Sequence, residues 1–178
     1  MALVTFQDLP STSTPLNAAN LNNNFNELNS KSAIRVGLSA NTSLAIETAY
    51  TNVLIPCDRV LAQKDNSNNN TFTFANNAVT INKAGWYMVS ANIMCNSTDS
   101  SQVTIGNIYQ TRANNTTNNL TEGYMKTGVS GYRTIALTPV PVELSVGDKI
   151  SLNITGSNTG NISVSGASRF TYLTIIKL

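Results

Sequence analysis

The chain has 178 residues, which is enough for one domain of ordinary size and a short additional segment. Asn, Thr and Ser together account for 66 residues, charged side chains make up 11%, and the formal net charge is +2. Because the charges are scattered, no basic patch indicates nucleic-acid binding. The sequence contains no His, which excludes His-based acid–base catalysis and His-ligated metal.

The first 33 residues differ in pattern from the rest of the chain. Residues 1–13 are rich in turn formers, and Thr14 and Pro15 are typical of a helix N-cap followed by Pro at the first helical position. Ala18, Leu21, Phe25 and Leu28 then recur at a/d spacing, which predicts a short helix with an apolar seam. The anchoring residues that we assign to this helix are Leu16, Leu21, Phe25 and Leu28.

Two interpretations of the predicted helix stay open. It either self-associates or docks on a partner, or it packs on its own domain. The first is favoured because the other faces of the helix are mostly Asn and because a helix this short is marginal alone in water. The N-terminus lacks a basic region followed by an apolar stretch, so we expect no signal peptide and no insertion into a membrane.

From residue 34 onward, alternating runs separated by Asn, Gly and Ser clusters predict about eight to ten strands. Phe74 is expected opposite Val79 in a hairpin that turns at Asn76 and Asn77. Residues 86–95 form the clearest strand, with a core face that comprises Tyr87, Val89, Ala91, Ile93 and Cys95. The pattern is typical of an antiparallel sandwich of one domain.

Two predicted strands carry apolar residues on a second face. The face of residues 86–95 that includes Trp86 and Met88 is too apolar for open solvent, so we expect a neighbouring subunit or a loop to cover it. The last run, residues 169–178, is also apolar on both faces, which is typical of a central strand or a subunit interface. We therefore assign four residues to a trimer interface or to the core: Trp86, Met88, Phe170 and Tyr172.

Motifs for common chemistry are absent from the sequence. There is no Gly-rich phosphate loop, no Cys-x-x-Cys and no calcium-loop spacing, so we expect no cofactor and no metal. Cys57 and Cys95 are too few for a disulfide framework, and a buried free thiol is favoured over a bridge for Cys95. The carboxylates, including Glu122 and Glu143, are expected in or beside turns. A glycosidase needs two carboxylates about 5–10 Å apart, and we do not expect an enzyme.

A carbohydrate-binding surface is the activity that the sequence favours. The stretch 102–133 has a weak strand pattern and many turn residues, and loops on a rigid sandwich are common binding surfaces. It contains aromatic and planar polar side chains of the kind that hold sugars. The tyrosines have an alternative interpretation as strand or trimer-core residues. The candidate receptor or glycan residues are Tyr109, Arg112, Asn114, Asn115, Tyr124 and Arg133.

Three segments resemble the globular heads of complement and tumour necrosis factor-like proteins. They are FTFANNAVTINKAGWYMVSANIMC (72–95), VELSVGDKISLNI (142–154) and SGASRFTYLTIIKL (165–178). Their order and spacing agree with that family, although Tyr172 stands where the family often has Gly. The resemblance covers roughly residues 34–178 and implies a ten-strand jelly roll that forms a tight homotrimer, with the final strand near the threefold axis.

The N-terminal stretch FQDLPSTSTPLNAANLNNNFNEL (6–28) resembles the start of many bacteriophage tail, baseplate and fibre proteins. In such proteins the segment typically anchors a trimeric appendage to the virion. The matching residues are Leu9, Pro10, Ser11, Thr14, Pro15, Leu16, Asn17, Ala18, Asn20 and Leu21. The resemblance implies that residues 1–30 contact other virion proteins and that the chain, made in the host cytoplasm, leaves the cell by lysis.

Together these resemblances divide the chain into an anchoring segment with a short trimeric helix (1–33) and a jelly-roll head (34–178). The function that we expect is a phage virion appendage whose head attaches to the host surface, with glycan as the receptor. The alternative is a capsid head fibre or decoration protein that has no dedicated receptor site. A polysaccharide-degrading enzyme is a third, less favoured hypothesis.

Overall fold

Two antiparallel β-sheets form the part of the chain that the structure describes. This computed structural model describes residues 31–65, 70–97, 99, 101–126, 131–166 and 170–178, and Ser32–Leu178 form one unit. The described residues contain thirteen strands and no helix. The anchoring residues Leu16, Leu21, Phe25 and Leu28 lie outside the described residues. The predicted helix and the division of the chain at residue 33 therefore stay predictions.

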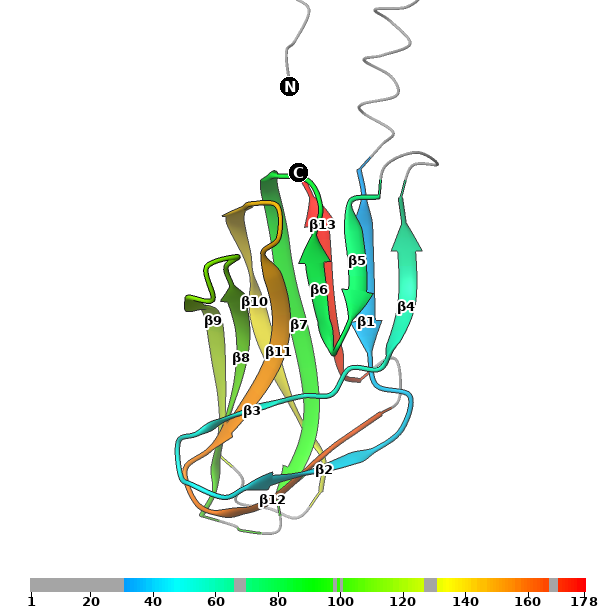
Figure 1. The fold of residues 1–178 in the computed structure, drawn as a ribbon. Helices are drawn as coiled ribbons and strands as arrows, with labels where there is room; N and C mark the ends of the chain where they lie inside the picture. Colours follow the sequence, from blue (N-terminus) through cyan, green and yellow to red (C-terminus); the bar gives the residue numbers. More distant parts are fainter. Residues whose placement is uncertain (1–30, 66–69, 98, 100, 127–130, 167–169) are drawn as a thin grey trace, which may run out of the picture. The chain divides into compact units, whose positions relative to one another are not determined.

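The larger sheet has seven strands, and its long strand β7 lies between β10 on one side and β13 with β12 on the other (Figure 1). In spatial order it comprises β2 (Thr42–Ile46), β12 (Gly160–Val164), β7 (Gly85–Ser97), β13 (Tyr172–Lys177), β1 (Ala33–Gly37) and β4 (Arg59–Lys64), with β10 (Arg133–Leu144) paired to β7. The expectation that the last run forms a central strand is confirmed, since β13 pairs with both β7 and β1.

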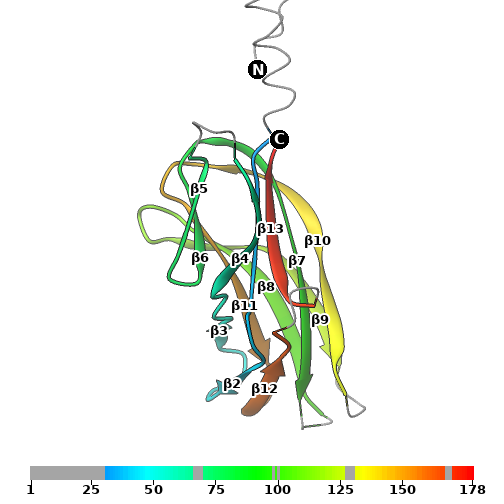
Figure 2. The same ribbon diagram turned by 90° about the vertical axis from the view of Figure 1, so that its right-hand side faces the viewer.

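The smaller sheet has six strands and packs against the first, so that the two form the layers of a sandwich (Figure 2). In spatial order it comprises β5 (Phe72–Ala75), β6 (Ala78–Ile81), β11 (Lys149–Gly156), β8 (Val103–Thr111) and β9 (Thr117–Lys126), with β3 (Asn52–Leu54) paired to β11. The strands number more than the eight to ten expected. The additional ones are short, and β2 and β3 depend on pairing with the distant strands β12 and β11.

The hairpin of β5 and β6 forms as predicted. Phe74 pairs with Val79 in the register of the ladder, and the two turn residues Asn76 and Asn77 have φ angles of 51° and 63°. Positive φ at both central residues defines the tight turn whose twist matches that of the flanking strands, and Asn tolerates this conformation.

The core lies between the two sheets, and β7 contributes the face that the alternation predicts. Tyr87, Val89, Ile93 and Cys95 are fully buried, and Ala91 is nearly so. The Tyr87 ring packs edge-on against Phe72 with centroids 5.9 Å apart, and its hydroxyl donates a hydrogen bond to the Lys83 carbonyl. Burying each large apolar side chain contributes roughly 1.5–3 kcal/mol, so this face of β7 anchors the sandwich.

Both cysteines are free and buried. The expected free thiol at Cys95 is therefore confirmed, and Cys57 shares this state. Burial raises the pKa of each thiol to about 12, with the Asp58 carboxylate as a smaller contribution at Cys57. Both thiols are therefore protonated at neutral pH, and the thiolate is the reactive form.

The turn before β11 is held by a buried carboxylate. Asp148 is 3% exposed and accepts hydrogen bonds from Gln110 Nε2 at 2.7 Å and from the Ser145 backbone N–H at 2.9 Å. Gly147 supplies a φ of 89° that other residues rarely adopt. The Val-Gly-Asp motif thus fixes where β11 begins, and β11 in turn carries β3 and β8.

Replacing Asp148 with Ala is expected to lower the free energy of unfolding by about 1–3 kcal/mol, because Gln110 Nε2 and the Ser145 N–H lose their acceptor. Urea unfolding should show a lower midpoint with an unchanged slope. Asp148→Asn keeps one acceptor oxygen and is expected to lose less. An Asp148→Ala midpoint equal to that of the unaltered chain would contradict this role for the carboxylate.

Candidate binding surface

Five of the six candidate receptor residues lie on the β8–β9 hairpin, and Arg133 lies on the other sheet at the start of β10. The expected loop region is therefore mostly two long strands, with the turn confined to residues 112–116. The alternation in β8 is hard to read because apolar Val103 and Ile105 lie on its outer face, whereas polar Thr104 and Gln110 lie on its buried face. The structure brings Tyr109 and Tyr124 onto one face and leaves Arg133 apart from them.

The turn residues Arg112, Asn114 and Asn115 shape the hairpin. The Asn114 side-chain oxygen accepts hydrogen bonds from the Thr116 N–H (3.0 Å) and hydroxyl (2.7 Å), and Asn115 adopts a φ of 65°. The Arg112 N–H donates to the Thr116 carbonyl at 2.8 Å. Such Asn-based turns satisfy their own backbone, so the two Asn residues act on the hairpin's shape.

The outer face of the smaller sheet carries a network of amide and hydroxyl groups below the turn. Strand register places Asn52, Thr155 and Asn107 on this face, and Asn107 and Thr155 are buried beneath their neighbours at 3% and 5% exposure. Thr155 Oγ1 donates to Asn52 Oδ1 at 2.6 Å, and Asn107 Nδ2 donates to the same oxygen at 3.3 Å. Asn52 Nδ2 donates to the Tyr109 hydroxyl at 2.7 Å.

A β-bulge in β9 extends the network to the edge of the sheet. The register shifts so that Ile108 pairs with Thr121 and Tyr109 with Asn119, which leaves Leu120 as the additional residue. Asn119 and Glu122, three residues apart, consequently share the outer face. Asn119 Nδ2 donates to Asn107 Oδ1 at 3.2 Å and to Glu122 Oε2 at 3.1 Å.

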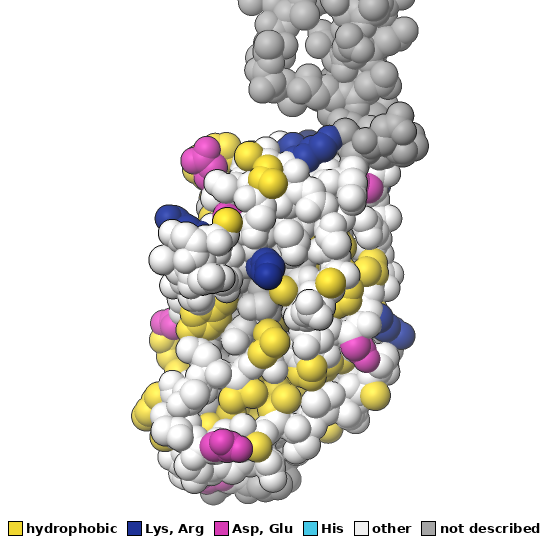
Figure 3. Space-filling model, in the orientation of Figure 1, with side chains coloured by type: hydrophobic (Ala, Val, Ile, Leu, Met, Phe, Trp, Pro, Cys, Tyr) yellow, Lys and Arg dark blue, Asp and Glu magenta, His cyan; other side chains and the backbone are white. Residues whose placement is uncertain are grey.

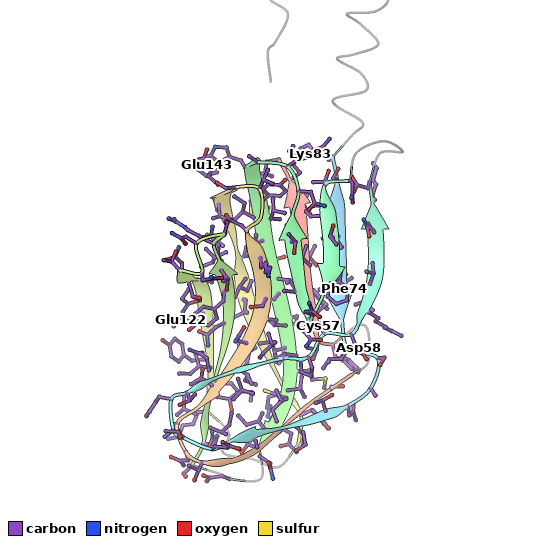
Figure 4. The ribbon with its side chains drawn as sticks, viewed as in Figure 1. Cys57, Asp58, Phe74, Lys83, Glu122 and Glu143 are labelled. Atoms are coloured by element: carbon purple, nitrogen blue, oxygen red, sulfur yellow. The ribbon has the colours of Figure 1, made fainter. Side chains whose placement is uncertain are left out.

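Glu122 lies midway along β9 (Figure 4), which corrects the expectation that this carboxylate belongs to a turn. Its other oxygen accepts a hydrogen bond from the Tyr124 hydroxyl, and this bond raises the pKa of Tyr124. Tyr124 is 63% exposed. Glu143 is the next-to-last residue of β10 and lies beside the turn at residues 145–148, as expected. The bulge is the reason that sequence alternation misses β9, since it breaks the period of two.

We call this set the amide–tyrosine surface; it comprises Asn52, Asn107, Tyr109, Asn119, Glu122, Tyr124 and Thr155. Only Tyr109 and Tyr124 were among the candidates from sequence. The alternation of Asn107 and Tyr109 along one strand is a signal that could have pointed to this face. The contribution of Asn52 and Thr155 depends on β3 and β11, which are distant in sequence. Figure 3 shows that charged side chains are sparse on this view of the molecule and that hydrophobic side chains lie scattered among other side chains and backbone.

One further aromatic residue stands beside this surface. Tyr50 precedes β3, is 67% exposed, and donates its backbone N–H to the Gly156 carbonyl at the end of β11 at 2.7 Å. Its φ of 61° is unusual for a bulky residue. Backbone strain of this kind costs about 1–3 kcal/mol and concentrates at functional positions.

The outer face of the larger sheet is mixed, since Met88, Ile176 and Tyr172 alternate there with Ser90, Asn92 and Thr174. Trp86 is 53% exposed, and Met88, Phe170 and Tyr172 are each half-buried, so none of the four belongs to the core of the sandwich. The Arg35 guanidinium stacks on the Tyr172 ring at 3.5 Å, and its buried Nε has no hydrogen-bond partner among the residues that the structure describes. An unpaired donor beside exposed apolar groups is costly in a monomer.

Within the described ranges, no three Cys, Asp or Glu side chains come close enough together to hold a metal ion. The same part of the chain has no helix with the length and apolar character needed to span a membrane.

Comparisons with known proteins show the fold. No protein-family model matches the chain, and no curated protein is significantly similar to it. A crystal structure of murine APRIL at pH 5.0 superposes with a TM-score of 0.62 at 14% identity and covers 83% of this chain and 99% of that chain. The structure of Eiger TNF from S. frugiperda gives 0.59 at 12% identity and covers 84% and 93%. The head is therefore an all-β, antiparallel, TNF-like jelly roll, as the sequence resemblance implies.

Proposed function

We propose that the chain is a phage virion appendage protein whose trimeric jelly-roll head attaches to the host surface through glycan. The main support for the attachment role is the amide–tyrosine surface. On this surface, hydrogen-bonding amides and an exposed tyrosine lie side by side on a rigid sheet. Tyr and Asn side chains of this kind supply contact area and adaptable hydrogen bonds in binding surfaces. The phage origin and the virion location rest on the sequence resemblance of residues 6–28.

The homotrimer is supported by the outer face of the larger sheet. Trp86 and Leu178 are about half exposed there, and the Leu178 N–H donates to the Trp86 carbonyl, so the chain's end lies beside the exposed indole. A neighbouring subunit would cover this patch. Exposed apolar patches of this kind commonly mark protein interfaces, and the resemblance to TNF-like heads implies three copies.

Enzymatic activity is not part of the proposal. The chain lacks His, and the described surface presents the single carboxylate of Glu122 among amides and hydroxyls. Such a set suits reversible recognition of hydroxyl groups, since it offers both donors and acceptors without a second acid to cleave a bond.

Binding of the purified full chain to cells of its bacterial host tests this function. The fluorescently labelled chain is expected to bind host cells, and an excess of unlabelled chain is expected to slow adsorption of the phage. Immunogold labelling of virions should place the chain at the tail. Absence of binding to host cells, together with unchanged phage adsorption, would contradict the attachment role.

A decoration or head-fibre protein without a receptor site is the second candidate. It is favoured by the fact that the groups of the amide–tyrosine surface already bond to one another, as a purely structural surface would. Labelling at capsid vertices combined with no effect on adsorption would support it over the first.

A further inference from the structure

We infer that the amide–tyrosine surface binds a neutral, hydroxyl-rich sugar, with Glu122 as the main acceptor for the sugar's hydroxyl groups. The inference rests on the proposed attachment function and specifies the ligand class and the residues. Three features carry it: the hydrogen-bonding capacity left over on this surface, its internal rigidity, and its charge.

The exposed side chains of the amide–tyrosine surface still have unused hydrogen-bond donors and acceptors after their bonds to one another are counted. An ionised carboxylate has about four acceptor positions, and Glu122 uses one for Asn119 and one for Tyr124. Asn119 donates both amide hydrogens, so its Oδ1 is an acceptor without a partner among the described residues. Asn52 donates one of its two amide hydrogens, to Tyr109.

Tyr109 completes the pattern of donors and acceptors. Its oxygen accepts from Asn52, and its own O–H has no acceptor among the residues that the structure describes. Acceptors on Asn119 and Glu122 of β9 thus lie on the same face of the sheet as donors on Tyr109 of β8 and Asn52 of β3. A sugar hydroxyl both donates and accepts, so adjacent hydroxyls on one ring match such an alternating set.

The spacing of the strands provides room for a saccharide. From β3 to β9 the surface crosses three inter-strand spacings, about 14 Å. Tyr124 is in the same row as Thr155 and Asn52, so an exposed aromatic ring stands at one end of the row. Aromatic faces pack against the C–H face of sugar rings while polar neighbours bond the hydroxyls.

The outer groups are held in place before any ligand binds. Asn107 is buried and bonds Asn52, Thr155 and Asn119, so it fixes the amides on both sides. Preorganised side chains lose little conformational entropy on binding. A shallow surface of this size binds one sugar weakly, and three copies on a trimer would raise the avidity.

Charge selects the class of sugar. Glu122 is the one charged group of the amide–tyrosine surface, and it bonds Asn119 and Tyr124 on the edge strand β9. Lys149 and Lys126 face outward on the same sheet but stand at its two ends, in the rows beyond Tyr109 and Tyr124. A carboxylated or sulfated sugar would place its anion against the Glu122 carboxylate, and the like charges would repel. A neutral sugar can make the same hydrogen bonds without this repulsion.

Glycan-array binding by the full chain tests the inference. The array carries neutral hexose oligosaccharides, uronic-acid or sulfated oligosaccharides, and oligosaccharides with free amines. Binding is expected to neutral hexose probes, with weaker binding to the anionic ones. Preferential binding to anionic probes, or to free-amine probes alone, would overturn the inference.

Variants then assign the binding to this surface. Glu122→Gln is expected to weaken binding to the selected neutral probe by about tenfold or more, because a hydrogen bond to a charged acceptor contributes about 1.5–3 kcal/mol. Glu122→Ala and Tyr124→Ala should weaken it further. Glu143→Gln is the matched control, since it removes the same charge from a strand of the other sheet, and its binding should equal that of the unaltered chain.

The outcomes separate this inference from the proposed function. If Glu122→Gln and Glu143→Gln, both with unchanged thermal unfolding, bind the neutral probe and host cells as the unaltered chain does, the inference is overturned and attachment occurs elsewhere on the head. If the unaltered chain binds no host cells, the proposed function itself fails. If Glu122→Gln loses binding to both host cells and the probe while Glu143→Gln keeps it, the result would support both the inference and the proposed function.

Discussion

Replacing Met88 with Glu is expected to convert the trimer into monomers while the head stays folded. Met88 is half-buried on the outer face of the larger sheet, so in a single chain the new carboxylate reaches water. In a trimer that covers this face the carboxylate would be buried and unpaired in all three subunits. Each such charge costs several kcal/mol, which is enough to dissociate an assembly of this size at micromolar concentration.

Sedimentation velocity measures this change directly. Met88→Glu should sediment as a monomer with an unaltered circular dichroism spectrum. Ala75→Glu is the control, because it places the same charge at an exposed position in β5 on the other sheet and should remain trimeric. A Met88→Glu chain that sediments as a trimer would show that the larger sheet's outer face is not the interface.

Replacing Tyr87 with Ala is expected to produce the largest loss of stability, about 3–5 kcal/mol. Tyr87 is fully buried, packs edge-on against Phe72, and bonds the Lys83 carbonyl through its hydroxyl. Truncation leaves a cavity between the sheets and removes the aromatic contact.

A pair of related variants separates the contributions of ring and hydroxyl. Tyr87→Phe keeps the ring and loses one hydrogen bond, so we expect a loss of only about 1 kcal/mol. Tyr124→Ala, at an exposed position, should change stability by less than about 0.5 kcal/mol. Denaturant unfolding of the three variants gives these values, and a Tyr87→Ala loss below that of Tyr87→Phe would contradict the assignment of Tyr87 to the core.

The sequence allows prediction of elements whose signal is local. The core face of β7 and the β5–β6 hairpin follow from alternation and from two Asn residues with positive φ. The buried role of Asp148 is harder to anticipate, because its partner Gln110 lies on another strand. Elements that depend on distant pairing, such as β3 on β11, have no local signal of this kind.

In the candidate site, too, local features are predictable from the sequence and features that depend on distant strands are not. Tyr109 and Tyr124 are predictable as aromatic residues in a polar region, but their common face is not, because the bulge at Leu120 reverses the alternation halfway along β9. Glu122 is expected in a turn for the same reason. The glycine pair Gly106 and Gly123 adds a second non-local effect, since a Cβ on either would approach Ile135 of β10 to 3.3 Å or less.

The mass of the purified full chain under native conditions tests the central claim, that this jelly roll works as a trimeric attachment head. Native mass spectrometry at micromolar concentration should show a species of about 57 kDa, three copies of the 19.0 kDa chain. An interface on the larger sheet would leave the amide–tyrosine surface, which lies on the smaller sheet, free to bind. A species at 19.0 kDa alone would contradict the account, because Met88 and Tyr172 on the larger sheet's outer face would then have no neighbouring subunit to cover them.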